Sequence, residues 1–120
     1  MPAYSFKERF VPLIKSGEKK QTIRSKRKRS TRRGEVLYLY FGLRTKWCTK
    51  IGEAICTDVK HIIIQPTGVF IEDHLLEDIE LEALAKADGF PDWEIMQRWW
   101  RQTHPLPFVG DIIYWNELKN

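Results

Sequence analysis

The sequence has only two cysteines, Cys48 and Cys56, and neither belongs to a C-x-x-C pair or lies in an H-E-x-x-H motif. Two cysteines are too few for a disulfide framework, and without paired ligand spacing a structural zinc is not expected. His61, His74 and His104 also lack metal-ligand spacing, which favours surface or capping roles. We therefore expect no metal or other cofactor, and we interpret both cysteines as buried free thiols.

Long apolar runs are also absent. No stretch approaches the roughly 20 apolar residues that cross a bilayer, and the N-terminus does not pair a charged start with a long apolar segment. We expect a soluble, cytoplasmic protein that has no membrane partner. The sequence has no Gly-rich phosphate loop and no nucleophile elbow, which argues against an NTPase and against a serine hydrolase.

The composition predicts one folded domain over residues 1–120. Hydrophobic residues make up 42% of the chain and include five Trp, four Tyr and six Phe, which is ample material for a core. A second core would leave each half of the chain too short to bury enough apolar surface.

The charges are unevenly distributed along the chain. The net charge is +4. Residues 15–33 carry ten basic residues and one acidic residue, whereas residues 72–94 carry nine acidic residues and one basic residue. A solvated loop is the simplest explanation of a basic run, but a run of this density favours a nucleic-acid partner. The acidic segment 72–94 offers a weaker alternative, a face that binds a basic protein partner.

Hydrophobic periodicity predicts an α+β fold. A short helix is expected over 7–16, ending at Gly17, and a brief strand over 21–24. Residues 25–34 contain no apolar anchor and are predicted to form an exposed, mobile loop. Further strands are expected at 36–41, within 50–64 as one or two strands, at 69–71 and at 108–115.

Two helices are expected late in the chain. The first contains Leu81, Leu84 and Ala85, and the second begins after Asp92, which is a good helix cap. Five or six short strands with one early helix and two late helices fit a small mixed β-barrel, because consecutive strands lie too close in sequence for parallel crossovers.

The segment from Gly17 to Arg24 places chemically useful side chains close together. In an extended strand Thr22 and Arg24 point to the same side, while Ile23 points into the core. The arginine supplies a planar fork suited to a phosphate or a base edge. A partly buried Lys19 can lose its proton near neutral pH and act as a base toward a nearby hydroxyl.

Several short motifs together resemble the ASCH domain family. They span about Phe10 to Trp115 and are a G-x-K-x-x-T-I-R segment at 17–24, Gly34 before a strand, Ile51-Gly52, an A-x-x-D-G-F segment at 85–90 and an F-x-G-D segment at 108–111. The resemblance implies a β-barrel related to the PUA RNA-binding domain. It also implies an RNA-related role, with a cleft lined by the G-x-K-x-x-T-x-R segment that holds a nucleobase or nucleotide.

The resemblance further implies a possible activity. Some bacterial members of the family hydrolyse the acetyl amide of N4-acetylcytidine with a lysine, a threonine and a glutamate, which correspond by position to Lys19, Thr22 and Asp88. Another member is reported as a ribonuclease. Asp88 is one methylene shorter than glutamate, and a displacement of about 1 Å can cost on the order of 100-fold in rate. RNA binding is therefore the first hypothesis, and hydrolysis of RNA or of a modified nucleoside is the alternative.

Cations of the motif and of the loop that follows it form the predicted nucleic-acid-binding set: Lys20, Arg24, Lys26, Arg27, Lys28, Arg29, Arg32 and Arg33. In the enzyme hypothesis Lys19 is the base, Thr22 the nucleophile or a positioning hydroxyl, and Asp88 the acid or an orienting carboxylate. The other interpretation is that Asp88 simply pairs with Arg24 or Lys19.

Aromatic residues leave further alternatives open. Helical spacing favours core packing for at least one of Trp99 and Trp100, although base stacking is an alternative for the other. Tyr38 and Tyr40 share one strand face, where they either close the core or form a stacking platform. Arg44 and Trp47 lie in a connection between strands, where they can contact a ligand.

Overall fold

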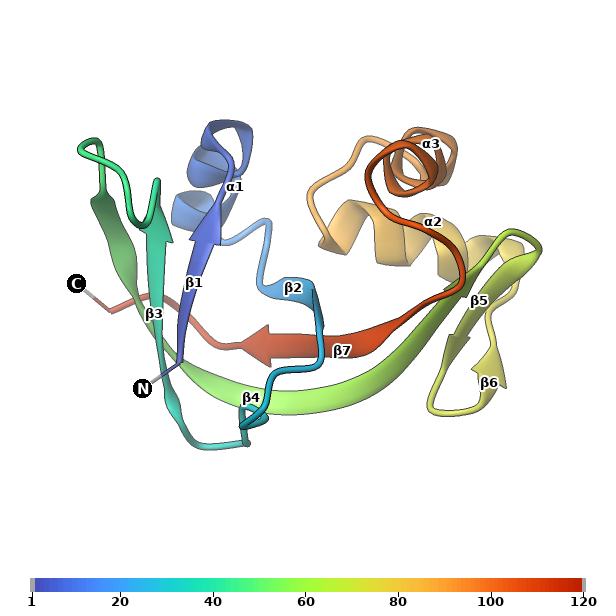
Figure 1. The fold of residues 1–120 in the computed structure, drawn as a ribbon, viewed down its shortest axis with the longest axis horizontal. Helices are drawn as coiled ribbons and strands as arrows, with labels where there is room; N and C mark the ends of the chain where they lie inside the picture. The colour runs from blue at the N-terminus through green and yellow to red at the C-terminus, as the bar shows by residue number, and fades with distance from the viewer. Residues whose placement is uncertain (1, 120) are drawn as a thin grey trace.

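The computed structural model describes residues 2–119 and shows a mixed seven-stranded sheet with helices on one side (Figure 1). In chain order the elements are β1 (Ala3–Phe6), a 3-10 turn η1 (Glu8–Phe10), α1 (Val11–Ser16), β2 (Gln21–Ser25), β3 (Val36–Phe41), β4 (Thr49–Gln65), β5 (Gly68–Ile71), β6 (His74–Leu75), α2 (Asp78–Ala87), α3 (Trp93–Thr103) and β7 (Phe108–Trp115). The predicted α+β class is confirmed.

The 17-residue strand β4 organises the sheet. Its first part pairs with β3, and its second part pairs with β7 on one edge and with β5 on the other. Strand β1 adds to β3 in parallel, and β2 adds to β7 in antiparallel. Because β4 bends along its length, the two ends of the sheet rise on either side of α1, α2 and α3 (Figure 1).

The predicted closed barrel is wrong. Among the described residues, no backbone ladder joins the two edge strands β1 and β2, whose pairing would close the sheet. Arginine side chains bridge these strands instead: Arg24 Nη2 donates to Ser5 O at 2.6 Å, and Arg27 Nη2 donates to Ala3 O at 3.0 Å. The expected five or six strands is also too few, since β1 and β6 are short and carry little sequence signal.

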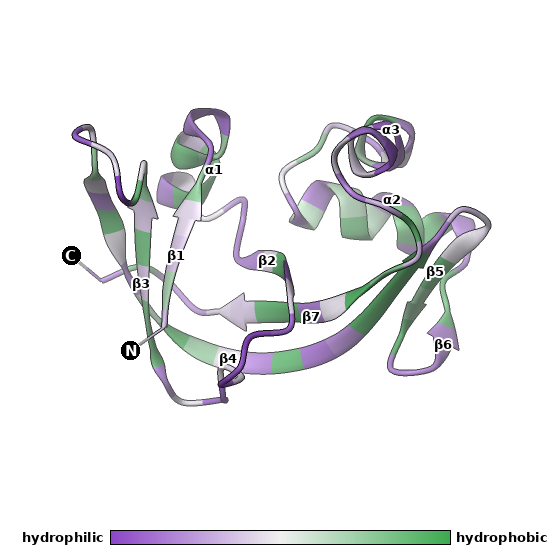
Figure 2. Cartoon of the chain, in the orientation of Figure 1, coloured by the Kyte–Doolittle hydropathy of each residue, from purple (hydrophilic) through white to green (hydrophobic). Residues whose placement is uncertain are grey.

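Period-two burial explains how the strands form the core. In β3, Leu37 and Leu39 are fully buried, while Tyr38 and Tyr40 on the opposite face are only partly covered. Green and white or purple segments alternate along the strands in Figure 2. Cys56 is buried as expected, whereas Cys48 is exposed, because it lies in the β3–β4 connection rather than in a strand.

The helix boundaries follow the predicted signals. Helix α1 ends at Gly17, whose φ of 86° is the left-handed conformation that glycine adopts without strain. A capping box of Glu77 and Glu80 starts α2, and the Asp92 side chain accepts a hydrogen bond from Ile95 N at the start of α3. Within residues 2–119, no helix is both long enough and apolar enough to pass through a bilayer.

The basic loop, residues 25–34, is exposed as predicted, but it is anchored. Thr31 is buried, and its hydroxyl is hydrogen-bonded to the hydroxyl of Tyr4 in β1. Glu35, which follows the loop, accepts hydrogen bonds from Arg32 N and from Arg29 Nη2. The loop therefore has a polar anchor in place of an apolar one, and its mobility stays a prediction.

Candidate functional site

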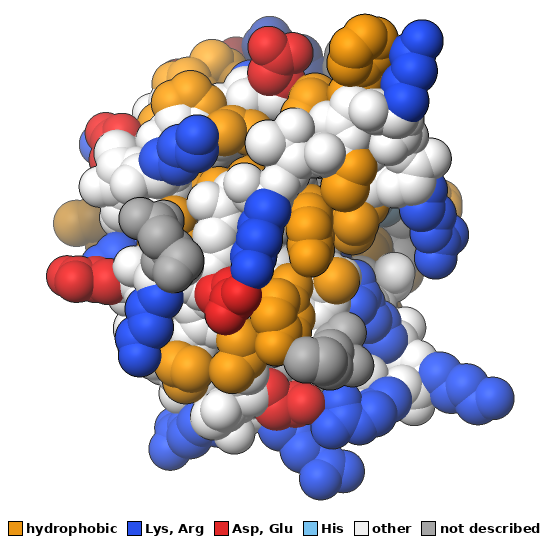
Figure 3. Space-filling model, turned by 90° about the vertical axis from the view of Figure 1, so that its left-hand side faces the viewer, with side chains coloured by type: hydrophobic (Ala, Val, Ile, Leu, Met, Phe, Trp, Pro, Cys, Tyr) orange, Lys and Arg blue, Asp and Glu red, His pale blue; other side chains and the backbone are white. Residues whose placement is uncertain are grey.

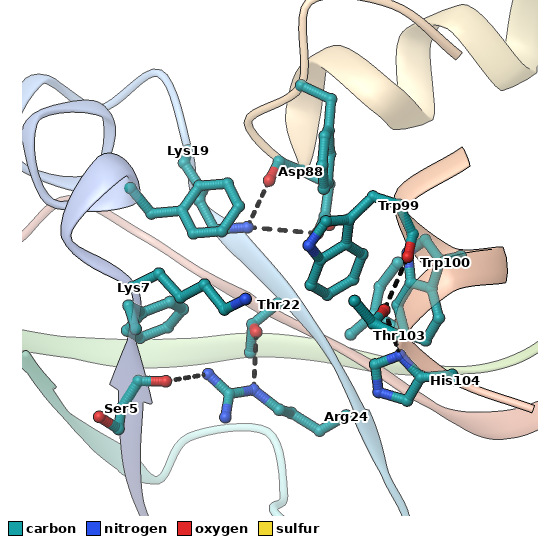
Figure 4. Close-up of a pocket in the computed structure, with 14 residues that line it drawn as sticks. Ser5, Lys7, Lys19, Thr22, Arg24, Asp88, Trp99, Trp100, Thr103 and His104 are labelled. Carbon is teal, nitrogen blue, oxygen red and sulfur yellow. Dashed lines mark hydrogen bonds and ion pairs between the residues drawn. The ribbon is translucent and has the colours of Figure 1, made fainter. Parts of the chain in front are cut away.

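A pocket of about 300 Å³ lies where β1 and β2 meet the C-terminal ends of α2 and α3 (Figure 4). Aromatic rings form much of its wall: Phe6, Phe10, Phe90, Trp99, Trp100 and His104. Polar side chains interrupt that wall: Ser5, Lys7, Lys19, Thr22, Arg24, Asp88 and Thr103. The pocket therefore offers flat apolar surfaces together with a small set of hydrogen-bonding groups, which is the usual make-up of a ligand site.

Lys19 and Asp88 form a buried pair in this pocket. Lys19 Nζ lies 2.6 Å from Asp88 O and 3.3 Å from Asp88 Oδ1, and Gln21 Nε2 donates to the same Oδ1 at 3.3 Å. Asp88 ends helix α2, so the lysine sits at the negative end of that helix. Although aspartate is shorter than glutamate, its carboxylate reaches the lysine.

Burial opposes charge on both partners. Removal from water lowers the pKa of Lys19, and the charge of Asp88 opposes this shift. Removal from water likewise raises the pKa of Asp88, against the effect of Lys19. Lys19 is therefore closer to its neutral amine form than a surface lysine is, which is the state that accepts a proton.

Thr22 and Arg24 form a second pair, on the β2 face that the sequence predicts. Arg24 Nε donates to Thr22 Oγ1 at 2.9 Å, while Ile23 between them is buried in the core. Burial, aided by the charge of Arg27, lowers the pKa of Arg24 to about 10. The guanidinium is still protonated at neutral pH, so it remains a cation at the pocket wall.

The structure thus brings all four residues of the predicted cleft, Lys19, Thr22, Arg24 and Asp88, into one pocket as two contacting pairs. The ion pair of Asp88 with Lys19 is the simpler of the two alternatives that the sequence leaves open. Contact alone assigns no chemical role, and the catalytic roles of Lys19, Thr22 and Asp88 stay predictions.

Sequence reasoning missed the side of the pocket that β1 and the residue after it supply. Ser5 and Lys7 were not singled out, because the four-residue strand β1 has no clear periodicity. Lys7 Nζ lies 5.4 Å from the centre of the Trp99 ring, within cation–π range. Trp99 is half-buried and Trp100 is buried, in line with the expectation that at least one of them packs in the core.

His104 closes α3 and lies against Trp100, with 4.3 Å between the ring centres. Thr103 Oγ1 donates to Trp99 O at 2.7 Å, so it accepts from His104 Nδ1, 2.9 Å away. This assignment leaves Nε2 of the neutral ring as a hydrogen-bond acceptor. Burial, followed by the charge of Lys7, lowers the pKa of His104 and favours that neutral form.

One buried donor of the pocket wall has no partner. The indole N–H of Trp100 is covered from solvent and makes no hydrogen bond to any other described residue. An unpaired buried donor is rare and costly in a folded protein.

The cations of the predicted nucleic-acid-binding set divide into two groups. Lys26, Arg29 and Arg33 form ion pairs with Asp111, Glu35 and Asp58, at 3.7, 2.9 and 3.5 Å respectively. The other predicted cations form no ion pair with a described acidic residue: Lys20, Arg24, Arg27, Lys28 and Arg32. This second group keeps its charge available to an anionic partner.

The basic loop is joined to the pocket through one aromatic ring. Arg24 Cζ lies 5.2 Å from the centre of the Tyr4 ring, and Arg27 Cζ lies 4.0 Å from it. Arg24 belongs to the pocket and Arg27 to the loop, so both guanidinium groups stack against the same tyrosine. The two predicted binding regions are therefore continuous.

The acidic segment 72–94 does not act as one exposed face. Glu72, Asp73, Glu77, Asp78 and Glu82 are exposed around β6 and α2, whereas Asp88 is buried in the pocket. Groups of acidic, histidine and cysteine side chains able to hold a metal ion are absent from residues 2–119. A basic protein partner for the exposed acids stays a prediction.

No family model matches the chain, and no curated protein matches it. Among solved structures, two single-residue variants of ZmASCH from Zymomonas mobilis superpose on it with a TM-score of 0.57 and 13% sequence identity. The matches cover 98% of this chain and 69% and 68% of the ZmASCH chains. This chain has the fold of an ASCH protein. The resemblance predicted from short motifs is thus confirmed for the fold, by a comparison that does not depend on those motifs.

Proposed function

We propose that the protein binds single-stranded RNA, with one base in the pocket and the adjoining backbone along the basic loop. The observation that carries this proposal is the continuity of the two regions: Arg24 of the pocket and Arg27 of the loop both lie against the ring of Tyr4. A base and its phosphates belong to one molecule, so a site for RNA needs both kinds of surface side by side.

The pocket suits a nucleobase in size and chemistry. A volume of about 300 Å³ is at the small end of ligand sites, which fits a single base or nucleoside. The rings of Trp99 and Phe90, 5.6 Å apart, provide apolar faces, and Thr22, Asp88 and His104 provide donors and acceptors for a base edge. Single-stranded bases are held in this way, by stacking together with edge hydrogen bonds.

The charge of the pocket suits an anionic ligand. Lys7, Lys19 and Arg24 bring three basic groups to the wall, and Asp88 is its one carboxylate among the described residues. Lys7 is exposed and makes no ion pair with a described acid, so it is free to contact a phosphate at the rim. A nucleotide is therefore expected to bind more tightly than the neutral nucleoside.

Titration with uridine monophosphate and with a labelled oligouridylate tests this proposal. Trp99→Ala is expected to weaken the binding of both ligands, by roughly tenfold, the effect of losing one stacked base. Trp93→Ala is the matched control, because it removes the same side chain from the same helix outside the pocket. Equal affinities for the two variants would contradict a base-binding pocket.

A second candidate function, hydrolysis of an acyl amide on a modified nucleoside or cleavage of RNA, is favoured by one observation. The amine of Lys19, whose pKa burial lowers, lines the same pocket as the hydroxyl of Thr22. In the amide reaction, neutral Lys19 Nζ takes the Thr22 proton as Oγ1 bonds to the acyl carbon, and returns it to the departing nitrogen as the C–N bond breaks. Water then cleaves the acyl ester, which releases the acid and restores the threonine. Asp88 orients Lys19 through its two contacts.

Incubation with N4-acetylcytidine and with labelled single-stranded RNA decides this candidate. If Lys19 is the base, product formation rises with pH through the lowered pKa of Lys19 and is lost in Lys19→Ala and Thr22→Val. Lys86→Ala, which removes an exposed lysine from α2, is expected to keep full activity. If neither substrate is converted, or if Lys19→Ala converts as well as the original chain, the enzyme hypothesis is wrong.

A further inference from the structure

Three aromatic side chains lie outside the pocket on the outer side of the β1–β3–β4 sheet and its hairpin tip. Tyr38 and Tyr40 occupy the face of β3 opposite the buried Leu37 and Leu39. Trp47, in the β3–β4 connection, is 67% exposed, a large value for so apolar a side chain. The proposed pocket site explains none of these three residues.

The tip that carries Trp47 is ordered by its own hydrogen bonds. Thr45 Oγ1 donates to Gly42 O at 2.7 Å and accepts from Trp47 N at 3.2 Å. Thr49 Oγ1 donates to Trp47 O at 3.0 Å. The tryptophan is therefore presented to solvent by a structured turn, so that little ordering remains to be done when a partner binds it.

Cations accompany each part of this surface. Lys46 Nζ lies 5.0 Å from the centre of the Trp47 ring, and Lys50 Nζ lies 5.7 Å from the centre of the Tyr38 ring. Lys50 is also the strand partner of Tyr40. Its carboxylate neighbour is Glu53, with which it forms an ion pair. Figure 3 shows this side of the molecule, where hydrophobic side chains lie together with several Lys and Arg side chains and some Asp and Glu side chains.

Strand β1 connects this surface to both parts of the proposed RNA site. Tyr40 is the strand partner of Ser5, which lines the pocket. Tyr38 is the strand partner of Ala3, whose carbonyl accepts a hydrogen bond from Arg27 of the basic loop. A chain that leaves the pocket past Ser5 therefore meets the tyrosines one strand away, at about 5 Å.

We propose that Tyr38, Tyr40 and Trp47 form a second contact surface for the same single-stranded RNA, on which bases outside the pocket stack. This inference rests on the proposed RNA binding and extends it beyond the pocket. The rings supply stacking faces without sequence preference. Lys46 forms no ion pair with a described acidic residue and lies beside Trp47, where it can neutralise a phosphate of the bound strand.

The spacing of the tyrosines favours separated bases over a continuous stack. Side chains two residues apart on one strand face are about 6.7 Å apart, roughly twice the 3.4 Å rise of stacked bases. Each tyrosine therefore takes one unstacked base, as aromatic residues on β-sheet faces do in RNA-binding modules. The lysines beside the rings of Trp47 and Tyr38 favour this polyanion over an apolar protein surface.

Affinity for a labelled oligouridylate long enough to extend beyond the pocket tests this inference. Trp47→Ala and Tyr40→Ser are each expected to weaken its binding by roughly tenfold, while leaving the affinity for uridine monophosphate unchanged. Ile79→Ala is the control, because Ile79 is 78% exposed on α2, away from this surface. A 4-thiouridine oligomer is expected to crosslink to peptides that contain residues 38–40 and 47.

The outcomes separate this inference from the pocket site. If the mononucleotide binds and depends on Trp99 but Trp47→Ala and Tyr40→Ser leave oligomer affinity unchanged, the second surface is wrong and the pocket site stands. If the mononucleotide does not bind yet both variants weaken oligomer binding, the surface stands and the pocket site fails. If Trp47→Ala changes only the oligomeric state measured by light scattering, the surface is a contact between protein copies and the inference is overturned.

Discussion

At the scale of single residues, Lys19 and Asp88 form an ion pair that is almost wholly removed from water. Both side chains are nearly removed from water, at 3% and 8% exposure, and their contact at 3.3 Å offsets the cost of burying them. Two buried ionisable groups in a pocket that also holds Thr22 and Arg24 are more typical of a functional site than of a stabilising core.

Removing one partner of this pair is expected to destabilise the protein strongly. Lys19→Met leaves Asp88 buried without its cation, at a cost of about 3–5 kcal/mol in the free energy of unfolding. The double variant Lys19→Met with Asp88→Leu is expected to recover most of that loss, since it removes both charges. Urea unfolding of the original chain, Lys19→Met, Asp88→Leu and the double variant measures this coupling. If the double variant is as unstable as Lys19→Met alone, the pair does not behave as an isolated buried ion pair.

His104 gives the pocket a pH dependence with a defined sign. Burial and Lys7 lower the pKa of His104 from 6.5 in the folded protein, so below pH 6.5 the unfolded chain binds more protons at this residue. The contribution of His104 to the free energy of unfolding is present above pH 6.5. It is lost as the pH falls from 6.5 through the lowered pKa of His104 in the folded protein. Relative to His104→Gln, the original chain is therefore expected to lose stability on acidification from pH 6.5. Thermal melts at several pH values measure the difference, and a difference that does not vary with pH would contradict the assignment.

At the scale of elements, the position of the pocket depends on the close approach of β2 and β7. A Cβ atom added to Gly110 in β7 would lie 2.3 Å from Arg24 O and 2.8 Å from the Phe108 ring. Strand β2 carries both Thr22 and Arg24, so the distance between these strands sets where two pocket residues stand.

Gly110→Ala is therefore expected to lower the free energy of unfolding by about 1–3 kcal/mol, as overpacking does, and to weaken ligand binding by displacing β2. Gly52→Ala is the comparison, because a Cβ at Gly52 would meet its nearest neighbour at 3.4 Å, an ordinary contact. Urea unfolding and nucleotide titration of both variants check the prediction. Equal effects of the two substitutions would show that the approach of β2 to β7 is not the limiting contact.

Local patterns predict elements whose signals are complete within their own residues. Alternation predicts β3, a run of β-branched and aromatic residues predicts β7, the glycine stop predicts the end of α1, and Asp92 predicts the start of α3. Strand β1 gives too short a pattern, and β6 has only two residues. The open sheet could not be predicted, because it depends on arginine side chains that occupy the β1 carbonyls where a strand ladder would form.

The candidate site can likewise be predicted from sequence only where its residues lie close together in one motif. Lys19, Thr22 and Arg24 lie within one short motif, so the sequence alone places them together, and the family resemblance adds Asp88. Lys7 and Ser5 were not predicted, because their place in the pocket depends on β1. Trp47 could be named only as a residue that can contact a ligand. Contacts between distant segments, such as Arg27 with Tyr4, have no signature in local sequence.

At the scale of the whole molecule, the charge is separated as its sequence suggests, with the basic loop beside β1 and the exposed acids around β6 and α2. These two regions lie at opposite sides of the sheet in Figure 1. Such a separation orients a polyanion toward the loop and away from α2, an effect that falls off with salt. Ion pairs with acids engage Lys26, Arg29 and Arg33. Arg27 has no such pair but contacts Ala3 O and the Tyr4 ring, so Lys28 and Arg32 are the loop cations best placed to contact phosphates.

The salt dependence of single-stranded RNA binding tests most directly whether pocket and loop act on one ligand. For the original chain, the logarithm of the association constant is expected to fall steeply with the logarithm of salt concentration. The Lys28→Ala and Arg32→Ala double variant is expected to reduce that slope by about 1.4, or 0.7 for each lost phosphate contact. Trp99→Ala is expected to weaken binding with the slope unchanged, and Lys86→Ala with Arg98→Ala, an equal loss of charge on α2 and α3, is expected to change neither. A loop variant with the slope of the original chain would contradict the account.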